Sequence, residues 1–156
     1  MKIIKEIVPY ILIIIAVILI RLFVITPVRV DGASMNPTLS NNEILLLNKM
    51  NKSYKRFDII VFNHNGNKLV KRIIGLPGDI VMYNNNTLYI NDKAVEENYT
   101  RKATDDFKSD KVPDNMYYVL GDNRSNSLDS RYIGFVSKED IEGVVNISII
   151  PPKIIK

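Results

Sequence analysis

Apolar residues are distributed so that the chain divides into one continuous hydrophobic run and a longer remainder of short apolar segments. The run covers residues 7–25, IVPYILIIIAVILIRLFVI, in which sixteen of nineteen residues are aliphatic or phenylalanine. At about 1.5 Å per residue, a helix of this length crosses a hydrocarbon core of roughly 30 Å. Pro9 falls in the first predicted turn, where its missing N–H does least harm, and Arg21 lies near the end, where its side chain can reach the interface. The pattern predicts one transmembrane helix.

A cleaved signal peptide is the alternative interpretation of this run. Signal peptides have shorter apolar cores that are followed by a cleavage site of small residues. Here the run is followed by TPVRVD, which has no small-x-small pattern. We therefore expect an uncleaved anchor over residues 7–25, preceded by a short cytoplasmic segment over residues 1–6. The charge bias behind this orientation is weak, because basic residues lie on both sides of the run: Lys2 and Lys5 before it, Arg21 and Arg29 toward the far side.

From residue 26 onward, segments rich in β-branched and aromatic residues alternate with turn signals. The predicted strands are residues 44–48, 57–63, 69–74, 80–83, 88–90, 117–120, 132–136 and 143–150. Residues 79–92 form a predicted hairpin over an asparagine triplet, and residues 98–114 form a predicted exposed loop. Ser137 is a predicted N-cap of a helical turn over residues 137–141. The fold class is therefore mostly β, with a single N-terminal transmembrane helix before a compact domain over residues 26–156.

Composition narrows the chemistry that this domain can perform. The chain has 156 residues, enough for one domain with an appendage. It has no cysteine and one histidine, His64, which excludes disulfides, thiolate zinc sites, cysteine nucleophiles and multi-histidine metal sites. The formal charge is +4, but residues 1–25 hold three basic side chains and one acidic one, which leaves 18 basic against 16 acidic. That balance predicts no basic stripe for nucleic acid.

Covalent hydrolysis in such a chain needs a serine or threonine activated by another base, usually a lysine whose pKa is lowered by burial. In the predicted strand at 69–74, LVKRII, each face is apolar apart from one cation. Lysine can lose its proton in such a place whereas arginine cannot, so Lys71 rather than Arg72 is the candidate base. The candidate nucleophile is Ser34, in the loop GASMNPTL, where glycine and proline favour a tight turn and a backbone N–H can point toward an oxyanion.

Each of these features also has an interpretation without chemistry. A lysine at a strand edge commonly extends into solvent, and a serine in a turn is commonly structural. His64 lies in a polar turn, NHNG, which is typical of an exposed side chain rather than a base. A third polar segment, GDNRSNSLDSR at 121–131, is either a self-hydrogen-bonded loop with internal ion pairs or a surface loop whose salt bridges contribute about 0–1 kcal/mol each.

Taken together, these segments resemble the bacterial type I signal peptidases of peptidase family S26, the membrane-bound serine proteases that remove signal peptides from exported proteins. The matching blocks follow the apolar run in the family's order: SMNPTL at 34–39, RFDIIVF at 56–62, KRIIGLPGD at 71–79 and GDNRSNSLDSR at 121–131. The resemblance implies a barrel-like β-sheet catalytic domain over residues 26–156, behind the anchor.

The resemblance also implies a role for individual residues of these blocks. Ser34 matches the nucleophile and Lys71 the general base. Ser127 matches the residue that orients the lysine amine, and Met35 lies close to the substrate groove. The supporting charges are an ion pair of Asp129 with Arg131 and the loop's structural acid and base, Asp122 and Arg124.

Two departures from the family pattern concern Gly32 and Phe57. Gram-negative members have a serine at the position of Gly32, and its hydroxyl helps to bind the oxyanion. With glycine here, as is common in Gram-positive members, the oxyanion is left to the Ser34 N–H plus another backbone donor or water, and the sequence does not identify which. Phe57 replaces a glycine of the family, which puts a local turn in doubt. The short interval between Lys71 and residues 121–131 leaves no room for the large domain inserted in Gram-negative members, which indicates the short Gram-positive form.

By resemblance, the reaction is acyl transfer without a metal or cofactor, and cleavage follows small residues at sites of the Ala-x-Ala type. The expected partners are secretory preproteins and the lipid bilayer, and the expected protein is a monomer that binds no nucleic acid. The resemblance implies a single-pass protein of the cell membrane, with a cytoplasmic N-terminus and an extracytoplasmic catalytic domain.

Two other functions are weighed against this one. A self-cleaving Ser–Lys protease of the repressor type shares a related β core, but it needs a DNA-binding domain and a cleavable linker. A membrane-tethered β domain that binds exported chains without cutting them is a function of another class. The presence of both Ser34 and Lys71 argues against it, because a decayed enzyme usually loses its nucleophile or base first.

Overall fold

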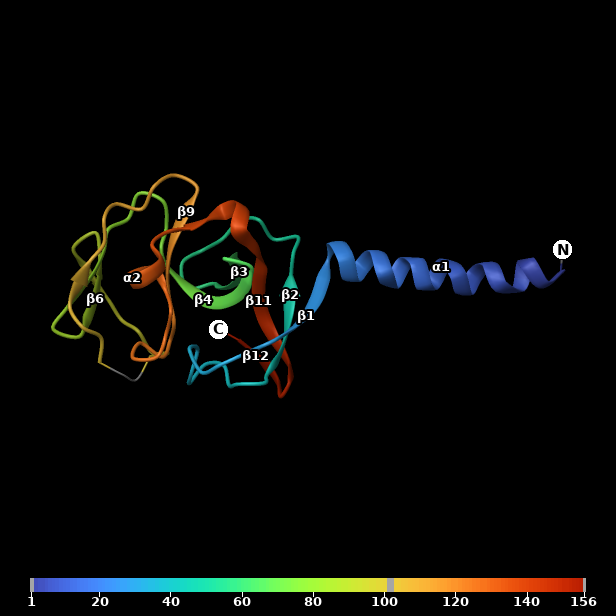
Figure 1. The fold of residues 1–156 in the computed structure, drawn as a ribbon, viewed down its shortest axis with the longest axis horizontal. Helices are drawn as coiled ribbons and strands as arrows, with labels where there is room; N and C mark the ends of the chain where they lie inside the picture. Colours follow the sequence, from blue (N-terminus) through green and yellow to red (C-terminus); the bar gives the residue numbers. More distant parts are fainter. Residues whose placement is uncertain (1, 101–102, 156) are drawn as a thin grey trace.

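The computed structural model describes residues 2–100 and 103–155, which form one long helix and a β domain (Figure 1). Helix α1 covers Lys2–Phe23, and its segment Glu6–Phe23 has a mean hydropathy of 2.5 with no residue buried. Within the described residues it is the one helix long and apolar enough to cross a membrane. The mostly β fold behind an apolar N-terminal helix, as predicted, is confirmed.

The ends of this helix differ from the predicted span. The helix begins at Lys2, so Pro9 lies inside it rather than in its first turn. It ends at Phe23, and Ile25 belongs to the first strand, where it pairs with Asn48. Pairing with a neighbouring strand therefore removes the last apolar residues of the run from the helix, which the hydropathy pattern alone does not reveal.

The larger of two antiparallel sheets has eight strands in the order β1-β2-β11-β3-β4-β9-β10, with β12 paired to β11. The bounds of its strands are β1 Ile25–Arg29, β2 Ile44–Asn48, β3 Ile59–His64, β4 Asn67–Gly75, β9 Met116–Leu120, β10 Val136–Ser137, β11 Ile141–Ile150 and β12 Pro152–Ile154. The predicted strand 44–48 matches β2 residue for residue. Strand β4 pairs with β3 through residues 67–72 and with β9 only from residue 72 onward. One edge of its first half therefore has no neighbouring strand among the residues that the structure describes.

The smaller sheet has four strands in the order β7-β6-β5-β8. Its strands are β5 Val81–Asn84, β6 Thr87–Ile90, β7 Lys93–Val95 and β8 Phe107–Lys108. The predicted hairpin over the asparagine triplet is confirmed, since Asn84 pairs with Thr87 across Asn85 and Asn86. Both turn residues have positive φ, 47° and 60°, as a two-residue type I′ turn requires and as asparagine tolerates.

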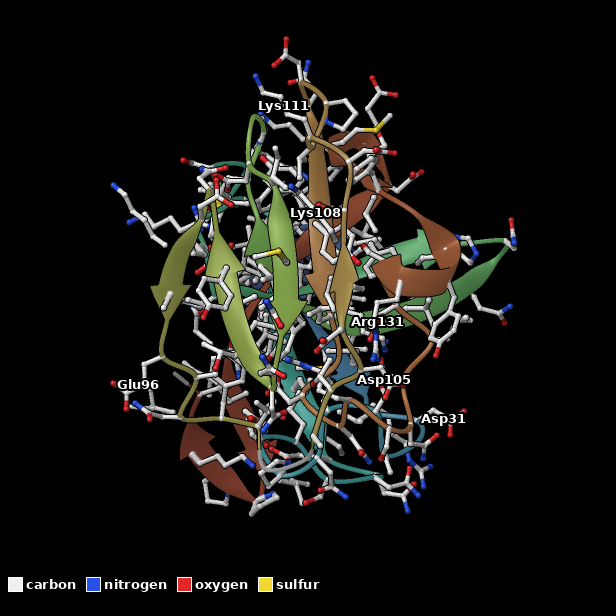
Figure 2. All side chains as sticks on the ribbon, turned by 90° about the vertical axis from the view of Figure 1, so that its left-hand side faces the viewer. Asp31, Glu96, Asp105, Lys108, Lys111 and Arg131 are labelled. Carbon is white, nitrogen blue, oxygen red and sulfur yellow. The ribbon has the colours of Figure 1, made fainter. Side chains whose placement is uncertain are left out.

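Helix α1 and the small sheet lie at opposite ends of the molecule, with the large sheet between them (Figure 1). Figure 2 looks onto the end remote from α1, where the charged side chains of Glu96, Lys108 and Lys111 extend from the small sheet and its loops. A cluster of apolar residues joins the two sheets, with Ile74 and Leu120 from the large one and Val81 and Leu88 from the small one. The small sheet is therefore packed onto the β4–β9 region.

Two predictions about the second half of the chain are wrong. Residues 132–135 are not a strand, and of the predicted segment only Val136 belongs to one, β10: Ser130–Ile133 forms the short helix α2, whose N-cap Asp129 accepts a hydrogen bond from Arg131 N. Residues 98–114 are not simply an exposed loop, because they contain β8 and the buried side chains of Thr104 and Val112. The predicted turn at 137–141 is confirmed as the 3₁₀ helix η1, Lys138–Asp140, capped by Ser137.

Candidate active site

Ser34 lies in the loop that joins β1 to β2. Two apolar side chains of this loop, Met35 and Leu39, are buried in a core cluster with residues of β2 and β11. Backbone hydrogen bonds from Asn36 N to Ala33 O (3.1 Å) and from Leu39 N to Met35 O (2.9 Å) tighten it. The loop is therefore anchored by its apolar residues, and Ser34 is held at a cleft between β1 and β4.

Lys71, on β4, is brought to Ser34 from 37 positions along the chain. Its Nζ lies 2.8 Å from Ser34 Oγ and 2.8 Å from the carbonyl oxygen of Val70. The residue is only 2% exposed. Burial disfavours the charged amine and lowers the pKa of Lys71 to about 8, while the carboxylates of Asp129 and Asp122 act in the opposite direction. A buried amine with this pKa can accept a proton from the adjacent hydroxyl.

Asp122 is paired with the neighbour of Lys71 and not with a residue of its own loop. Its carboxylate accepts from Arg72 Nε at 2.9 Å and from Arg72 Nη2 at 2.7 Å, and both side chains are fully buried. Thr38, in the loop of Ser34, donates its hydroxyl to the same carboxylate at 2.5 Å. The pair thus connects three parts of the site: β4, the loop of Ser34 and the loop 121–131.

The other three charged residues of the loop 121–131 are also in ion pairs. Arg131 Nε lies 2.8 Å from Asp129 Oδ1, and Asp129 Oδ2 accepts from Gly121 N at 3.1 Å. Arg124 pairs with Glu97 of the segment after β7 at 2.5 Å and also donates to the Tyr83 hydroxyl. Asp129 and Arg131 therefore pair with each other as expected, whereas Asp122 and Arg124 each bind a partner distant in the sequence.

Comparison with known proteins identifies the family of the chain. The family model "Signal peptidase, peptidase S26" matches residues 2–150. The chain belongs to the signal peptidase family S26. It is 45% identical to "Signal peptidase I" of Bacillus amyloliquefaciens over 86% of this chain and 80% of that one, and 45% identical to "Signal peptidase I S" of Bacillus subtilis (strain 168) over 86% and 82%.

A crystal structure of a signal peptidase I from Enterococcus faecalis V583 is similar in fold. It superposes with a TM-score of 0.56 and 44% identity, over 59% of this chain and 96% of that one. The chain is accordingly a serine endopeptidase of the signal peptidase I type, a membrane-anchored family whose members remove signal peptides. Helix α1 fits the membrane span of such a peptidase.

Ser127 is the predicted site residue that the structure does not bring to its expected partner. Its Oγ is buried and forms no hydrogen bond within the described part of the chain. It lies close to both Gly121 and the backbone of Ser34: a Cβ added to Gly121 would be 2.2 Å from Ser127 Oγ and 2.6 Å from Ser34 O. The hydroxyl is thus in the site of this peptidase, and Lys71 donates to Ser34 and Val70 instead.

Gly32 and Met35 lie on either side of Ser34 along the chain of this peptidase. Gly32 has φ 92°, a region that favours glycine, and its N–H donates to Asn41 Oδ1 at 3.0 Å. That N–H is directed to a side chain of its own loop. Met35 is 1% exposed and lines the floor of the cleft, together with Val28, Val30, Leu69 and Val70. The cleft encloses about 70 Å³.

The backbone turn at Phe57 is present, although the family pattern has a glycine at this position. It has φ 72°, in the left-handed region that glycine adopts without strain. Its N–H donates to Ile73 O at 2.8 Å, and its carbonyl accepts from Arg72 Nη1 at 3.0 Å. The ring packs on Tyr99, with centroids 5.8 Å apart. Packing and hydrogen bonds therefore hold a conformation that the residue type disfavours.

His64 lies at the far end of the β3–β4 hairpin. It pairs with Asn67, four positions along the register from the pair of Lys71 with Ile60. At about 3.3 Å per residue this separates the imidazole's strand position from that of the amine by roughly 13 Å. Its ring nitrogen contacts Asn65 Nδ2 at 3.2 Å. Ser34 therefore has its hydrogen bond with Lys71 and not with the histidine.

Sequence reasoning missed several residues of the charged network around Ser34 and Lys71. Arg72 had a signal, because an arginine between apolar residues cannot lose its proton and must find a buried acid. Glu97 and Tyr99 had no signal in the sequence, since they lie in a polar segment and contact residues far along the chain.

Within residues 2–100 and 103–155 no group of three or more histidine, cysteine, aspartate or glutamate side chains is arranged to hold a metal ion.

Proposed function

We propose that this peptidase cleaves signal peptides with a catalytic dyad of Ser34 and Lys71. The observation that carries the proposal is the 2.8 Å contact between Lys71 Nζ and Ser34 Oγ at a position where the lysine is 2% exposed. Burial keeps the pKa of Lys71 near 8, so a substantial fraction of the amine is neutral at the pH of an ordinary cell exterior. A neutral amine in contact with a hydroxyl is what nucleophilic activation requires.

The proposed reaction is acyl transfer in two steps. Lys71 accepts the proton of Ser34 as Oγ attacks the carbonyl carbon of the scissile peptide, and the protonated lysine then gives that proton to the leaving amine. Water, deprotonated by the same lysine, attacks the acyl-enzyme ester, and the proton returns to Ser34 Oγ. The Ser34 N–H is the proposed donor to the oxyanion, since Gly32 carries no side chain and its own N–H is bound to Asn41.

The proposed substrate is a preprotein that binds in an extended form between β1 and β4. Within residues 2–100 and 103–155, residues 67–71 of β4 have no neighbouring strand on one edge, and β1 pairs only with β2. A sheet edge of this kind can accept an added strand. The cleft between them, lined by Met35 and four other apolar residues, encloses about 70 Å³, which supports small side chains at the −1 and −3 positions, as in Ala-x-Ala.

The proposed topology has residues 1–6 in the cytoplasm, residues 7–25 around the membrane span and residues 26–156 outside the cytoplasm. Lys2 and Lys5 favour a cytoplasmic N-terminus. Enzyme and preprotein then meet at one membrane surface, which raises the local concentration of the cleavage site. Protease digestion of intact and permeabilised spheroplasts tests this arrangement. The β domain should be digested in intact spheroplasts, and its protection there would contradict the proposal.

We propose that the enzyme acts as a monomer, which light scattering of the detergent complex tests.

The proposed dyad is tested with a preprotein that bears one Ala-x-Ala site, cleaved by the detergent-solubilised full chain. The wild type is compared with Ser34→Ala, Lys71→Ala and the matched surface variant Lys108→Ala on β8, with circular dichroism as the check on folding. We expect cleavage at the site by the wild type and Lys108→Ala alone. Full activity of Lys71→Ala would reject the dyad, and a folded, inert wild type would favour a binding domain instead.

A further inference from the structure

Asn123 contacts the backbone on both sides of the nucleophile. Its N–H donates to Ser34 O at 2.9 Å, and its side-chain Nδ2 donates to Ala33 O at 3.0 Å. The residue is 9% exposed, and its Oδ1 accepts from the Ser125 hydroxyl at 3.3 Å, which fixes the orientation of the amide. One residue of the loop 121–131 thus binds the carbonyl before Ser34 and the carbonyl of Ser34 itself.

The bond to Ala33 O determines where the Ser34 N–H points. Carbonyl and N–H of one trans peptide are coplanar and directed oppositely, so fixing Ala33 O fixes the direction of the following N–H. Ala33 O also accepts from Asn36 N at 3.1 Å, but that donor belongs to the same short turn and moves with it. Asn123 is the donor that reaches this peptide from a different part of the chain.

The loop that carries Asn123 is itself held rigidly. Arg124 donates from Nε to Gly121 O at 3.0 Å, and Arg131 Nη2 donates to Arg124 O at 2.7 Å. Asp129 binds Gly121 N. These bonds hold the loop 121–131 in place, and Asn123 links this loop to the backbone of Ala33 and Ser34.

We propose that Asn123 is a positioning residue that aims the Ser34 N–H at the oxyanion of the tetrahedral intermediate. This inference rests on the proposed function of Ser34 and adds the residue that orients its amide. A rate effect follows because donors to an oxyanion act only when they lie close to the position that the oxygen will take. The hydrogen bonds of Asn123 go to Ser34 O and Ala33 O and not to Lys71. We therefore expect the residue to act through Ser34, on the stabilisation of the oxyanion and not on the basicity of the amine.

The test compares Asn123→Asp and Asn123→Ala with the wild type in the full, detergent-solubilised chain. Asn123→Asp keeps the size and the backbone N–H but replaces the Nδ2 donor by an oxygen. Asn126→Ala is the matched control, because Asn126 lies in the same loop with an exposed side chain. We expect kcat to fall by about 10- to 100-fold in both Asn123 variants, less than the loss of an oxyanion donor itself, with KM within about twofold and Asn126→Ala near the wild type.

Two further readouts separate aiming from general damage. Affinity for a peptide aldehyde ending in Ala-x-Ala, which forms a tetrahedral adduct on the serine, should fall by the same factor as kcat. In Asn123→Ala, which adds no charge near Lys71, the midpoint of the acid limb of the pH–rate profile should stay in place. A wild-type kcat in Asn123→Asp, an unchanged aldehyde affinity or a shifted acid limb in Asn123→Ala would each overturn the proposal. If neither variant folds, Asn123 is structural and the proposal is rejected. Failure of the dyad itself is seen separately, as cleavage by Ser34→Ala or none by the wild type.

Discussion

The two faces of β4 carry adjacent cations, Lys71 and Arg72, in opposite electrostatic surroundings. The two residues lie opposite Ile60 and Ile59, which belong to different core clusters. Arg72 lies between the Asp122 carboxylate, at 2.7 Å, and the ring of Tyr99, 4.1 Å from its centroid. Lys71 binds a hydroxyl and a carbonyl, and no ion pair to its amine is formed within residues 2–100 and 103–155.

This difference shows how one strand can bury two cations in two physically different ways. An arginine cannot shed its charge, so its burial requires a carboxylate with matching geometry. A lysine without such a carboxylate responds to burial by a lowered pKa. Arg72 has a carboxylate partner, whereas Lys71 has no ion pair within the described residues, as the proposed role of Lys71 as a base requires.

The largest effect is expected when Lys71 is replaced by arginine, the residue type found at position 72. Lys71→Arg keeps the charge and length but cannot lose its proton, so the cleavage rate should fall by about 10²–10⁴, the usual contribution of a general base. Initial rates with an Ala-x-Ala preprotein measure the loss, and Lys108→Arg on β8 is the control. Activity within a factor of ten of the wild type would mean that the basicity of Lys71 is not used.

On the opposite face of β4, substitution of Arg72 should lower the stability of the fold. Arg72→Met leaves Asp122 buried and unpaired, which should lower the free energy of unfolding by about 3–5 kcal/mol. Denaturant titration of the solubilised chain measures this value. The double variant Arg72→Met with Asp122→Leu should recover most of it, because no charge is then left without a partner. A single variant as stable as the wild type would show that the pair does not hold β4.

A third change affects the packing between Gly121, Ser127 and the backbone of Ser34. Gly121→Ala adds a Cβ 2.2 Å from Ser127 Oγ and 2.6 Å from Ser34 O, so these atoms must move. A displacement of about 1 Å at a nucleophile can cost about 10²-fold in rate, and we expect a kcat lower by about 10- to 100-fold. Gly66→Ala, at a turn with open space around it, is a control for the residue type, although its φ of 79° carries strain of its own. A wild-type kcat for Gly121→Ala would mean that Ser127 is free to move.

The smallest effect is expected at the third cation of the strand. Lys68 forms an ion pair with Glu142 at 2.7 Å, with the lysine side chain 53% exposed. Solvent screens such a pair, so Glu142→Gln should change the free energy of unfolding by about 0–1 kcal/mol. The same denaturant titration applies, and a loss approaching that of Arg72→Met would remove the contrast between exposed and buried cations.

The contrast on β4 was partly visible in the sequence. LVKRII shows two cations in an apolar strand, and the inability of arginine to deprotonate makes Lys71 the candidate base. Which acid would serve Arg72 is not visible, because Asp122 lies 50 positions away and pairs through tertiary contacts. The position of Ser127 was likewise expected from resemblance alone, and the structure leaves its hydroxyl without a partner in the described residues.

Errors in the predicted fold have the same origin. Apolar residues at 132–136 favoured a strand, but the Asp129 side chain caps a helical turn there and leaves Tyr132 exposed. Phe107 lies in a polar segment, yet it pairs with Tyr83 in the small sheet and stacks on it at 5.5 Å. Local pattern identified the long strands and the hairpin, whereas capping and pairing between distant segments decided these two places.

The most direct test of the central claim is the pH dependence of kcat/KM, which reports the ionisation of the free enzyme. Burial lowers the pKa of Lys71 from 10.5 to about 8, and only the neutral amine can accept the proton of Ser34, so the rate should fall as the pH drops through about 8. Preprotein cleavage by the solubilised full chain from pH 5 to 11 measures the midpoint. A midpoint near 8 is the predicted result; a rate that stays level down to about pH 5, or a midpoint near 10.5, would contradict a buried lysine base.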